Sequence, residues 1–323
     1  MSNVTVLMSV YNGMPYLPKA VDSILAQTFE DWKFVIVNDG STDGSAKYLE
    51  SLKDPRIQVV TQENQGLAAA LNNGLQHCDT TYVARLDSDD ISLPHRLEEQ
   101  VKYLDEHPEV GMLGSQFLRM GPERCGFASS LPCDHTAIHK ALMEARHAVC
   151  HPTIMCKTEV MKQIGGYWKH PVAQDWDLYL KMCENTQVAN LDKVLLKYRV
   201  HTGSLNGKYL ARIRRNQRFA AEIARRRTHN EPEIELEDFD DLEKKKSLSW
   251  RWQEKLNVFA MYQYRRALQK CLSNKWSEGY MRLGFAAVCS PRLAFQRIRR
   301  ILDHKQPMTA QPALSIRAGS VKE

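Results

Sequence analysis

The sequence predicts an α/β fold with a mostly parallel sheet flanked by helices, followed by a helical C-terminal region. Apolar strand-like segments alternate four times with helix-like segments up to Leu104, a pattern typical of layered α/β proteins. Each of these strands ends in a polar loop, and the chain turns into long basic helix-favouring stretches after residue 205. We therefore expect an α/β domain over residues 1–205, a basic helical region over 206–305 and a disordered tail over 306–323.

The four expected strands are short runs rich in β-branched and apolar residues. They cover Val4–Val10, Lys33–Val37, Ile57–Thr61 and Thr81–Leu86. The helices between them are expected at Tyr16–Gln27, from a cap at Asp43 or Ser45 to Leu52, at Gly66–Gln76 and from Pro94 to Leu104. Ligands of open α/β sheets bind beyond the carboxyl ends of the strands. The loops after these strands should therefore lie close together, namely Tyr11–Asn12, Asp39, Asn64–Gly66 and Asp87–Asp90.

The rest of the chain is less regular. Strands are expected at Val110–Phe117, Val149–Cys156 and Lys193–Val200, and helices at Thr136–Glu144, Thr158–Ile164 and Asp175–Cys183. Farther on, long helices are expected at Leu210–Arg227 and Leu242–Leu272, with an acidic loop around Glu231–Asp241 between them.

Charge divides the chain into two unlike parts. Residues 1–205 contain 19 Lys and Arg against 25 Asp and Glu, and residues 206–323 contain 25 against 13, so the net charges are −6 and +12. A basic region can meet nucleic acid, an anionic membrane or an acidic substrate. Nucleic acid is not expected as a partner, because the basic helices contain no recognised nucleic-acid-binding motif.

Cysteine usage and hydropathy bear on the location of the protein. The eight cysteines are scattered, without a CxxC pair or zinc-ligand spacing, which favours a reduced, cytosol-facing protein. No signal-peptide pattern and no apolar run of about 20 residues is found. We therefore expect a cytoplasmic protein that meets the cytosolic face of a membrane at most peripherally. The basic amphipathic segment 292–302 is the candidate for that contact, and its alternative is a helix that packs back on the α/β domain.

The strongest chemical pattern is Asp87-Ser88-Asp89-Asp90, which follows an apolar strand. Carboxylates two residues apart can give hard oxygen ligands to Mg²⁺ or Mn²⁺, and acidic side chains this close repel one another without a cation. The alternative is a solvated acidic turn that caps the next helix. Asp39 ends the second strand at the same expected edge, where it could bind a ligand or simply form an Asp-Gly turn.

Several motifs occur in a fixed order along the first 205 residues. They are Ser9-Val10-Tyr11-Asn12, Val37-Asn38-Asp39-Gly40-Ser41-Thr42-Asp43, Asn64-Gln65-Gly66-Leu67, Ala84-Arg85-Leu86-Asp87-Ser88-Asp89-Asp90, Gly165-Gly166-Tyr167, Gln174-Asp175-Trp176-Asp177-Leu178 and Tyr198-Arg199-Val200-His201. Together they resemble the family 2 inverting glycosyltransferases of GT-A fold, whose nucleotide-binding half is Rossmann-like. The resemblance covers roughly residues 3–205.

The resemblance implies a role for each matching position. Asp175 matches the catalytic base of the family, and Asp87 and Asp89 match its Asp-x-Asp motif. Asp89 would bind the metal, Asp87 the metal or the ribose, and His201 would be a further metal or phosphate contact. The nucleotide site would comprise Ser9, Tyr11 near the base, Asn12, Asp39 hydrogen-bonded to the base, Gly66, Arg85 and Asp87.

Two positions depart from the family pattern. Gln174 stands where the family often has Glu, which leaves the base itself in place. Leu71 stands where many members have Arg, which leaves phosphate neutralisation to the metal or to Arg85. Simpler alternatives exist for two site residues: Asp175 as an acid stabilised by the dipole at a helix N-terminus, and His201 as an ordinary surface or packed histidine.

The implied function is inverting transfer of a sugar from a nucleoside diphosphate sugar, expected to be a UDP-sugar, with Mn²⁺ or Mg²⁺ as cofactor. The acceptor would be a hydroxyl of a glycan or lipid-linked sugar in cell-surface polysaccharide or lipopolysaccharide assembly. Two alternatives stay open. A nucleotidyltransferase would favour a Gly-rich phosphate loop, which Ser9–Gly13 does not supply. A non-catalytic nucleotide-sugar-binding scaffold would have no need of Asp175.

Overall fold

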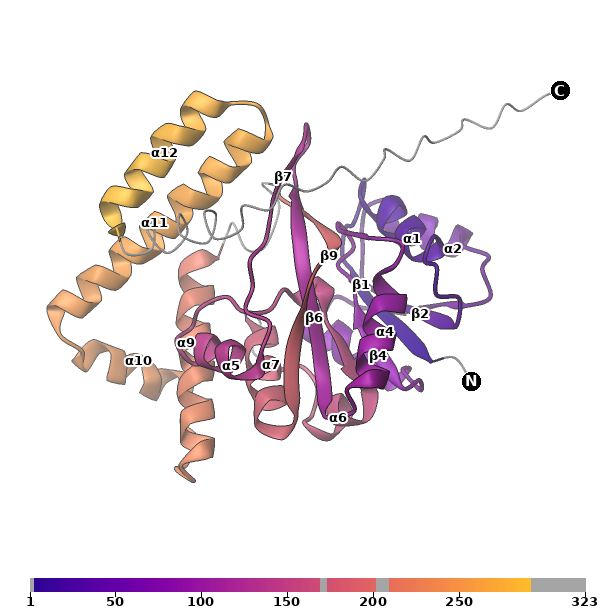
Figure 1. Ribbon diagram of the computed structural model, residues 1–323, viewed down its shortest axis with the longest axis horizontal. Coiled ribbons are helices and arrows are strands. Elements are labelled where there is room, and N and C mark those ends of the chain that lie inside the picture. The colour runs from indigo at the N-terminus through magenta and orange to yellow at the C-terminus, as the bar shows by residue number, and fades with distance from the viewer. Residues whose placement is uncertain (1–2, 169–172, 202–208, 292–323) are drawn as a thin grey trace.

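A single mixed sheet lies at the centre of the protein. The computed structural model describes residues 3–168, 173–201 and 209–291. Figure 1 shows the sheet between two groups of helices, with the C-terminal helices on the left of the view. The strands form the order β3-β2-β1-β4-β8-β6-β9-β5, and β7 pairs with β6.

The first four strands run parallel, as the sequence predicts. They are β1 (Val4–Val10), β2 (Trp32–Asp39), β3 (Ile57–Gln62) and β4 (Tyr82–Arg85). The helices between and after them are α1 (Leu17–Leu25), α2 (Ser45–Ser51), α3 (Leu67–Gln76) and α4 (Arg96–Glu106). In the register of β1 and β2, Val10 lies opposite Asn38, so the loops after both strands leave the same edge of the sheet.

The second half of the sheet is mixed. Strand β6 (Val110–Met120) runs parallel to β9 (Gln187–Arg199), and β8 (Met155–Lys157) lies antiparallel between β4 and β6. Short β5 (Ile91–Ser92) and β7 (Cys125–Ala128) pair antiparallel with β9 and β6. The expected α/β fold with a mostly parallel sheet is confirmed.

The expected strand at Val149–Cys156 is wrong over most of its length. A 3-10 turn, η1 (His151–Thr153), precedes a strand that begins only at Met155. Pro152 explains the turn, because proline has no backbone N–H to donate to a sheet ladder and its ring fixes φ. The turn ends close to β4, where Arg85 N–H donates to the Ile154 carbonyl at 2.9 Å.

The sheet is buried on both faces, as parallel sheets usually are. Leu7 belongs to one apolar cluster, whereas its neighbours Val6 and Met8 belong to the other. The first cluster is completed by α3 and by α5 (His135–Met143), α7 (Gln174–Asn185) and α9 (Leu210–Thr228). The second is completed by α1, α2 and α4. Short α6 (Thr158–Gln163) follows β8.

The C-terminal helices continue from α9 as α10 (Leu236–Lys245), α11 (Leu248–Leu272) and α12 (Trp276–Cys289). The expected acidic loop around Glu231–Asp241 is therefore wrong in its second half, since α10 begins at Leu236. Acidic residues in the first turn and lysines in the last turn of α10 suit the helix dipole. The helix expected over Leu242–Leu272 is interrupted before Leu248. Ser247 caps the start of α11 there, because its hydroxyl accepts from Trp250 N–H at 3.2 Å.

The expected boundary at residue 205 stays a prediction. Helix α9 packs against α5 and α7. None of the helices in the described ranges is both long and apolar enough to span a membrane. The segment 292–302, expected to be a basic amphipathic helix, and the expected disordered tail 306–323 lie outside the described residues.

Candidate active site

The loop after β1 is tied to the loop after β2. Asn12 Oδ1 accepts hydrogen bonds from the backbone N–H groups of Thr42 at 2.8 Å and Asp43 at 3.2 Å, and Asn12 N–H donates to Ser41 Oγ at 3.1 Å. Asn12 has a φ of 52°, a left-handed conformation that asparagine tolerates better than most residues. The two loops predicted to meet at the sheet edge therefore do meet, through Asn12.

Asp39 organises the loop in front of α3. It is buried, and its carboxylate accepts from Gln62 Nε2 at 2.8 Å and from the N–H groups of Gln65 and Gly66, each at 2.9 Å. Gly66 has a φ of 88°, which glycine adopts without strain from a Cβ. Asp39 thus fixes the loop Asn64–Gly66, and its predicted hydrogen bond to a base stays a prediction.

Two further predicted nucleotide residues lie at the end of β1. Ser9 is buried opposite Val37 of β2, whereas Tyr11 exposes 54% of its surface. An aromatic ring that is open to solvent beside ordered polar loops can stack on a nucleobase. Ser88 lies near this loop as well, since a Cβ added at Gly13 would be 3.6 Å from Ser88 Cβ. The first loop is therefore next to the acidic loop after β4.

The acidic loop brings three carboxylates together. Asp87, Asp89 and Asp90 each offer an oxygen, and these oxygens lie within 4.8 Å of one another. Asp90 is buried; its Oδ1 accepts from Arg199 N–H at 2.7 Å, while its Oδ2 has no hydrogen-bond partner among the described residues. Burial, and then the charges of Asp89 and Asp87, raise the pKa of Asp90 well above its ordinary value. A divalent cation fits this cluster, because it would offset the repulsion and accept hard oxygen ligands.

Arg85 fixes Asp87 from inside the protein. The guanidinium is buried, and it donates to Asp87 Oδ1 at 2.5 Å and to the carbonyls of Leu7 and Leu86. Burial raises the pKa of Asp87, and the charge of Arg85 opposes this shift. In this arrangement Arg85 is directed at Asp87, so the predicted contact between Arg85 and phosphate stays a prediction.

His201 lies beside Asp89 although 112 residues separate them in the chain. Its Nε2 is 2.8 Å from Asp89 Oδ2, and its ring lies 5.3 Å from that of Tyr16. The structure therefore places His201 with the acidic cluster, as the resemblance implies. A histidine nitrogen at this position can share a metal with Asp89 or hold its carboxylate in place.

Arg199 connects β9 to the acidic loop, and the sequence gives no role for it in advance. Besides the bond from its N–H to Asp90, its Nε donates to the Asp89 carbonyl at 2.7 Å. Its guanidinium carbon lies 4.3 Å above the ring of Tyr16. These contacts fix the backbone of the loop that presents the carboxylates.

Arg96 is a second missed residue. It is fully buried at the start of α4, and its Nη2 donates to the carbonyls of Arg85 at 2.7 Å and Ile154 at 3.2 Å. Its Nε donates to Gln100 Oε1 at 2.9 Å, and burial lowers the pKa of Arg96 to about 9. Arg96 thus joins the end of β4 to the turn before β8. An arginine at the first position of an amphipathic helix gives no sequence sign of such burial.

Asp175 lies in the first turn of α7, half-buried. Burial raises the pKa of Asp175 to about 6, and the hydrogen bond from Tyr179 Oη to Asp175 Oδ2, at 3.1 Å, works in the opposite direction. The charge of Asp87 also raises the pKa of Asp175, so the two carboxylates interact electrostatically. A carboxylate with a pKa near neutrality is suited to accept a proton.

Aromatic rings pack against one another beside Asp175: His151 contacts Tyr167 and Tyr179. His151 Nε2 lies 3.0 Å from Tyr167 Oη, and burial lowers the pKa of His151 well below its ordinary value, which keeps the ring neutral. The Tyr167 backbone is paired in both directions with the amide of Asn72, at 2.8 Å each. Leu71, which departs from the family pattern, is a core residue, and its neighbour Asn72 tethers the Gly165-Gly166-Tyr167 loop to α3.

Sequence comparison identifies relatives of known class. The sequence profile described as glycosyl transferase family 2 matches residues 5–165. The chain is 34% identical over 215 residues to the O-antigen biosynthesis glycosyltransferase WbnJ of Escherichia coli, covering 64% of this chain and 84% of WbnJ. It is 33% identical over 211 residues to the amylovoran biosynthesis glycosyltransferase AmsE of Erwinia amylovora, covering 62% of this chain and 78% of AmsE.

Solved structures share the fold. The crystal structure of S. aureus TarS in complex with UDP-GlcNAc matches with a TM-score of 0.55 and 15% identity, covering 92% of each chain. The mannosyltransferase PcManGT of Pyrobaculum calidifontis, in complex with GDP-Man and Mn²⁺, matches with a TM-score of 0.51 and 18% identity, covering 94% of this chain and 80% of that one. The GT-A fold expected from the motifs is thus confirmed, and the relatives show that this chain is an enzyme belonging to glycosyltransferase family 2.

Proposed function

We propose that this enzyme transfers a sugar, with inversion at its anomeric carbon, from a nucleoside diphosphate sugar to a hydroxyl of a glycan or lipid-linked acceptor. The principal observation is Asp175, a half-buried carboxylate with a pKa of about 6 that interacts with the acidic cluster. Family membership favours sugar transfer over the nucleotidyltransferase and scaffold alternatives. The names of WbnJ and AmsE support a role in cell-surface polysaccharide assembly, and the UDP-GlcNAc of TarS supports a UDP-sugar.

In the proposed reaction the acceptor oxygen attacks the anomeric carbon while Asp175 takes the hydroxyl proton. The bond from that carbon to the diphosphate oxygen breaks, and its electron pair leaves with the nucleoside diphosphate. A single displacement inverts the carbon and needs no second carboxylate as a nucleophile. Tyr179 orients Asp175 by donating to its Oδ2, which leaves Oδ1 for the acceptor hydroxyl.

Asp87 and Asp89 would hold Mn²⁺ or Mg²⁺, with Asp90 behind them and His201 beside Asp89. When bound, such an ion stabilises the negative charge of the leaving diphosphate as a Lewis acid. Arg85 and Arg199 keep the acidic loop in one conformation, so the carboxylates are arranged before the ion arrives.

The nucleotide would lie at the loops after β1 and β2. Tyr11 is the candidate for stacking on the base because its ring is exposed. Asn12 and Asp39 hold these loops, including Gly66, through side-chain hydrogen bonds, and Ser9 is buried at the end of β1. In this proposal Asp39 acts on the base through the loop that it fixes as well as by direct contact.

Calorimetry with UDP, GDP, dTDP and CDP, each with Mn²⁺ and then with EDTA, tests the proposal. We expect UDP to bind most tightly and EDTA to weaken that binding strongly. A donor panel with the bound nucleotide would then identify the sugar. If no diphosphate binds under either condition, the acidic cluster is structural and the proposed site is wrong.

The proposed acceptor, if lipid-linked, would lie at a membrane surface. The net charge of +12 over residues 206–323 supports contact with an anionic surface, and the proposed location is the cytosolic face of the membrane.

A further inference from the structure

Helix α12 exposes apolar side chains along one face. Tyr280, Met281, Phe285 and Val288 expose 62%, 58%, 55% and 80% of their surfaces. Residues three and four apart lie on the same side of a helix, so Met281, Phe285 and Val288 form one stripe, and Tyr280 stacks on Trp276 one turn before it. The exposed residues of α12 are uncharged, and the half-exposed side chain of Glu278 pairs with Lys270 of α11. A solvated helix face normally contains charged residues, so this face is not built for water alone.

Helix α11 has a second exposed stripe, made of Leu248, Trp252, Leu256, Phe259 and Tyr262. These residues are also spaced by three and four, and Leu248 and Trp252 expose 71% and 65% of their surfaces. The exposed charged side chains of α11 are all basic: Arg251, Lys255 and Arg266. The acidic Glu254 forms ion pairs with Arg214 and Arg218 of α9, so its charge is offset.

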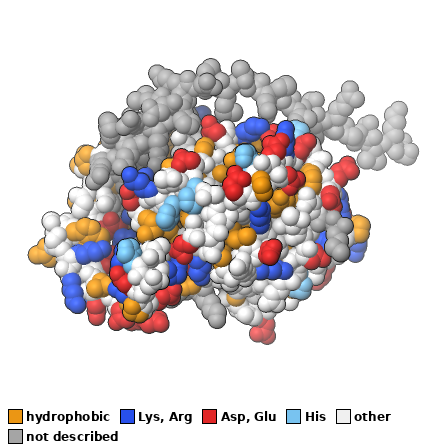
Figure 2. Space-filling view, turned by 60° about the horizontal axis from the view of Figure 1, so that its bottom comes forward, with side chains coloured by type: hydrophobic (Ala, Val, Ile, Leu, Met, Phe, Trp, Pro, Cys, Tyr) orange, Lys and Arg blue, Asp and Glu red, His pale blue; other side chains and the backbone are white. Residues whose placement is uncertain are grey.

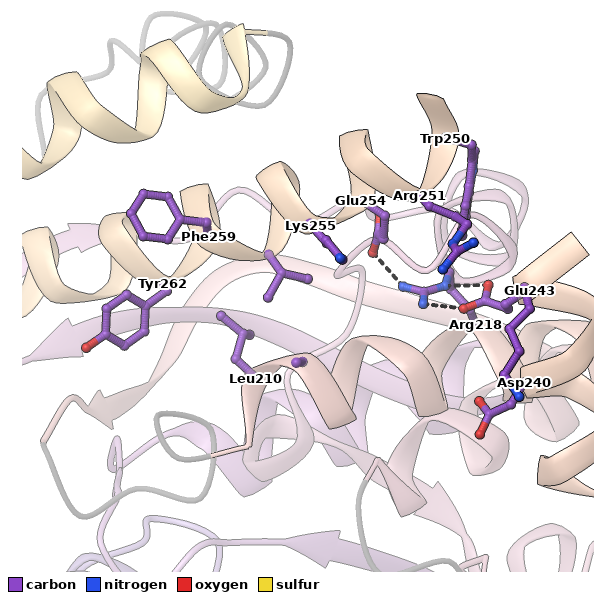
Figure 3. Close-up of a pocket in the computed structure, with 13 residues that line it drawn as sticks. Leu210, Arg218, Asp240, Glu243, Trp250, Arg251, Glu254, Lys255, Phe259 and Tyr262 are labelled. Atoms are coloured by element: carbon purple, nitrogen blue, oxygen red, sulfur yellow. Dashed lines mark hydrogen bonds and ion pairs between the residues drawn. The ribbon is translucent and has the colours of Figure 1, made fainter. Parts of the chain in front are cut away.

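A groove of about 670 Å³ runs between α11 and α9. Figure 3 shows Phe259, Tyr262 and Leu210 at its apolar end, and the ion pairs of Arg218 with Glu243 and Glu254 at its polar end. The apolar end of the groove is thus continuous with the stripe of α11. Its polar end is lined by side chains that pair with one another.

The exposed stripes are not a sign of loose packing between the two helices. Gly279 of α12 approaches α11 so closely that an added Cβ would lie 2.4 Å from Cys271 Sγ. Leu272 of α11 packs against Gly121 and Gly126 of the β6–β7 hairpin. The surfaces of α11 and α12 that face each other and the sheet are therefore filled. Helices α11 and α12 together are called here the C-terminal hairpin. Large apolar patches that remain exposed on a well-packed protein usually mark a contact with a partner or a membrane.

We propose that the exposed stripes of α11 and α12, called here the hairpin face, dock this enzyme on an anionic lipid membrane. Tryptophan and tyrosine are the side chains most enriched at the boundary of a bilayer. Basic residues beside an apolar helix face are attracted to anionic headgroups. The hairpin face combines both features, with Arg251 and Lys255 next to Trp252.

The charges favour a membrane over a second copy of this chain. A two-fold dimer places the same surface of each subunit against the other. Arg251, Lys255 and Arg266 would then face the same three cations of the second copy, and like charges across an interface oppose association. An anionic lipid surface has the complementary sign.

Acidic side chains concentrate on the neighbouring helix α10 instead. Asp240 and Glu243 of α10 pair with Arg215 and Arg218 of α9, and Asp241 pairs with Lys244. Figure 2 shows acidic side chains gathered at the lower left of the molecule, with basic and hydrophobic side chains beside them, on the side where Figure 1 places the C-terminal helices. The acidic surface of α10 thus borders the hairpin face across the groove, with most of its carboxylates paired to arginines and lysines.

Docking by the hairpin face would bring the active site close to the membrane. Arg265 of α11 interacts electrostatically with Tyr198, whose pKa is raised by burial and then by Asp90 and Asp89. Helix α11 therefore approaches the end of β9, the strand that precedes His201. Only this consequence rests on the proposed function, since it matters for an acceptor that is itself held in the membrane.

Co-sedimentation of the full chain with vesicles tests the docking. One set of vesicles contains phosphatidylglycerol and phosphatidylcholine in equal parts, and a second contains phosphatidylcholine alone. We expect binding to the anionic vesicles, and a loss of affinity of about tenfold or more when Trp252→Gln and Val288→Gln are combined. The double variant Arg251→Gln, Lys255→Gln should bind the anionic vesicles less well than wild type. Its recovery with vesicles of phosphatidylcholine alone should equal that of wild type. Leu25→Gln with Val59→Gln is the matched control, because both residues are exposed apolar side chains on other elements.

Three outcomes would overturn the docking. Equal recovery of wild type and the Trp252/Val288 variant would remove the hairpin face as the contact. A loss confined to the full-length variant Arg297→Gln, Arg299→Gln and Arg300→Gln would assign the contact to segment 292–302. A dimer that dissociates in the Trp252/Val288 variant, with no vesicle binding by wild type, would assign the face to a second copy.

The vesicle assay can fail or succeed independently of the proposed sugar transfer. Each variant is also titrated with UDP and Mn²⁺, and we expect unchanged nucleotide affinity, which shows that the α/β part is folded. Vesicle binding without nucleotide binding in the wild type would defeat the proposed donor site and leave the docking in place. Nucleotide binding without vesicle binding would defeat the docking and leave the proposed donor site in place.

Discussion

The carboxyl edge of the sheet and the C-terminal hairpin place their side chains in opposite ways. At the sheet edge, charged groups are inside: Arg85, Asp90 and Arg96 expose at most 1% of their surfaces. On the hairpin, apolar groups are outside, as Trp252 and Val288 show. Both arrangements cost free energy, the first through desolvation of charge and the second through hydration of apolar surface.

The difference indicates two kinds of binding site in one chain. Buried carboxylates with raised pKa values suit a cation and a diphosphate, because ligand charge offsets their repulsion. An exposed aromatic and basic stripe suits a lipid surface, because contact with lipid removes apolar groups from water. Substitutions in one region should therefore leave the function of the other unchanged, and the prediction for Asp89 below tests that separation.

The largest effect is expected at Asp175. Asp175→Asn keeps the size of the side chain and removes the proton acceptor, so transfer should fall by about 10²- to 10⁴-fold while UDP and Mn²⁺ binding persists. Initial rates of nucleotide release with donor and acceptor-containing membranes measure the loss. Asp192→Asn, at an exposed position of β9, is the matched control. Near-full transfer by Asp175→Asn would show that another group is the base.

A smaller effect, on binding instead of proton transfer, is expected at Asp89. Asp89→Ala removes a carboxylate from the acidic cluster and the partner of His201. The affinity for UDP in the presence of Mn²⁺ should fall by about a hundredfold, as measured by calorimetry. Vesicle binding by the hairpin face should not change.

Asp79→Ala is the control for Asp89→Ala, because Asp79 is an exposed aspartate that pairs with Lys33 on the surface. Its affinity for UDP should equal that of wild type. If Asp89→Ala binds UDP as tightly as wild type and EDTA has no effect on either, the cluster does not hold a metal that the nucleotide needs.

Features that depend on local pattern were predictable from the sequence. The four parallel strands follow from apolar runs, and the polar loops after them meet because parallel strands end at one edge. That placement brings Asn12 to Thr42 and Ser88 near Gly13. The approach of His201 to Asp89 followed only from the family resemblance, since the two are 112 positions apart in the chain.

Features that depend on tertiary contacts were not predictable. Arg96 and Arg199 are ordinary surface residue types, and only the fold buries or directs them onto backbone groups of the acidic loop. Tyr179 reaches Asp175 because the two lie one helical turn apart, a relation that the sequence contains but that has no chemical meaning until the base is identified. The hairpin face was missed for another reason: its stripes resemble the buried face of an amphipathic helix.

The close packing of α12 on α11 can be tested by measuring the free energy of unfolding. Gly279→Ala places a Cβ 2.4 Å from Cys271 Sγ, so it should lower the free energy of unfolding by about 1–3 kcal/mol. Gly284→Ala, on the same helix, meets no atom within 4 Å and should raise it by about 0.5–1 kcal/mol because alanine favours helix. Urea unfolding measures both. Equal destabilisation by the two substitutions would contradict the close packing of α12 on α11.

The smallest expected effect is a shift in pH dependence. Asp175 must be ionised to accept a proton, so kcat/KM should rise with pH through a pKa of about 6. The hydroxyl of Tyr179 lowers that pKa by donating to Asp175. Tyr179→Phe should therefore move the acid limb to higher pH, by roughly half a unit to one unit if the bond contributes about 1 kcal/mol.

Tyr82→Phe provides the comparison for this shift. Its hydroxyl also donates to a carboxylate, Asp105 Oδ1 at 2.6 Å, but it lies at the start of β4, at the opposite end from the acidic loop. The acid limb of Tyr82→Phe should coincide with that of wild type. A limb that moves equally in both variants would reflect a general change in the fold, and a limb that moves to lower pH in Tyr179→Phe would mean that a group other than Asp175 governs the rise in rate.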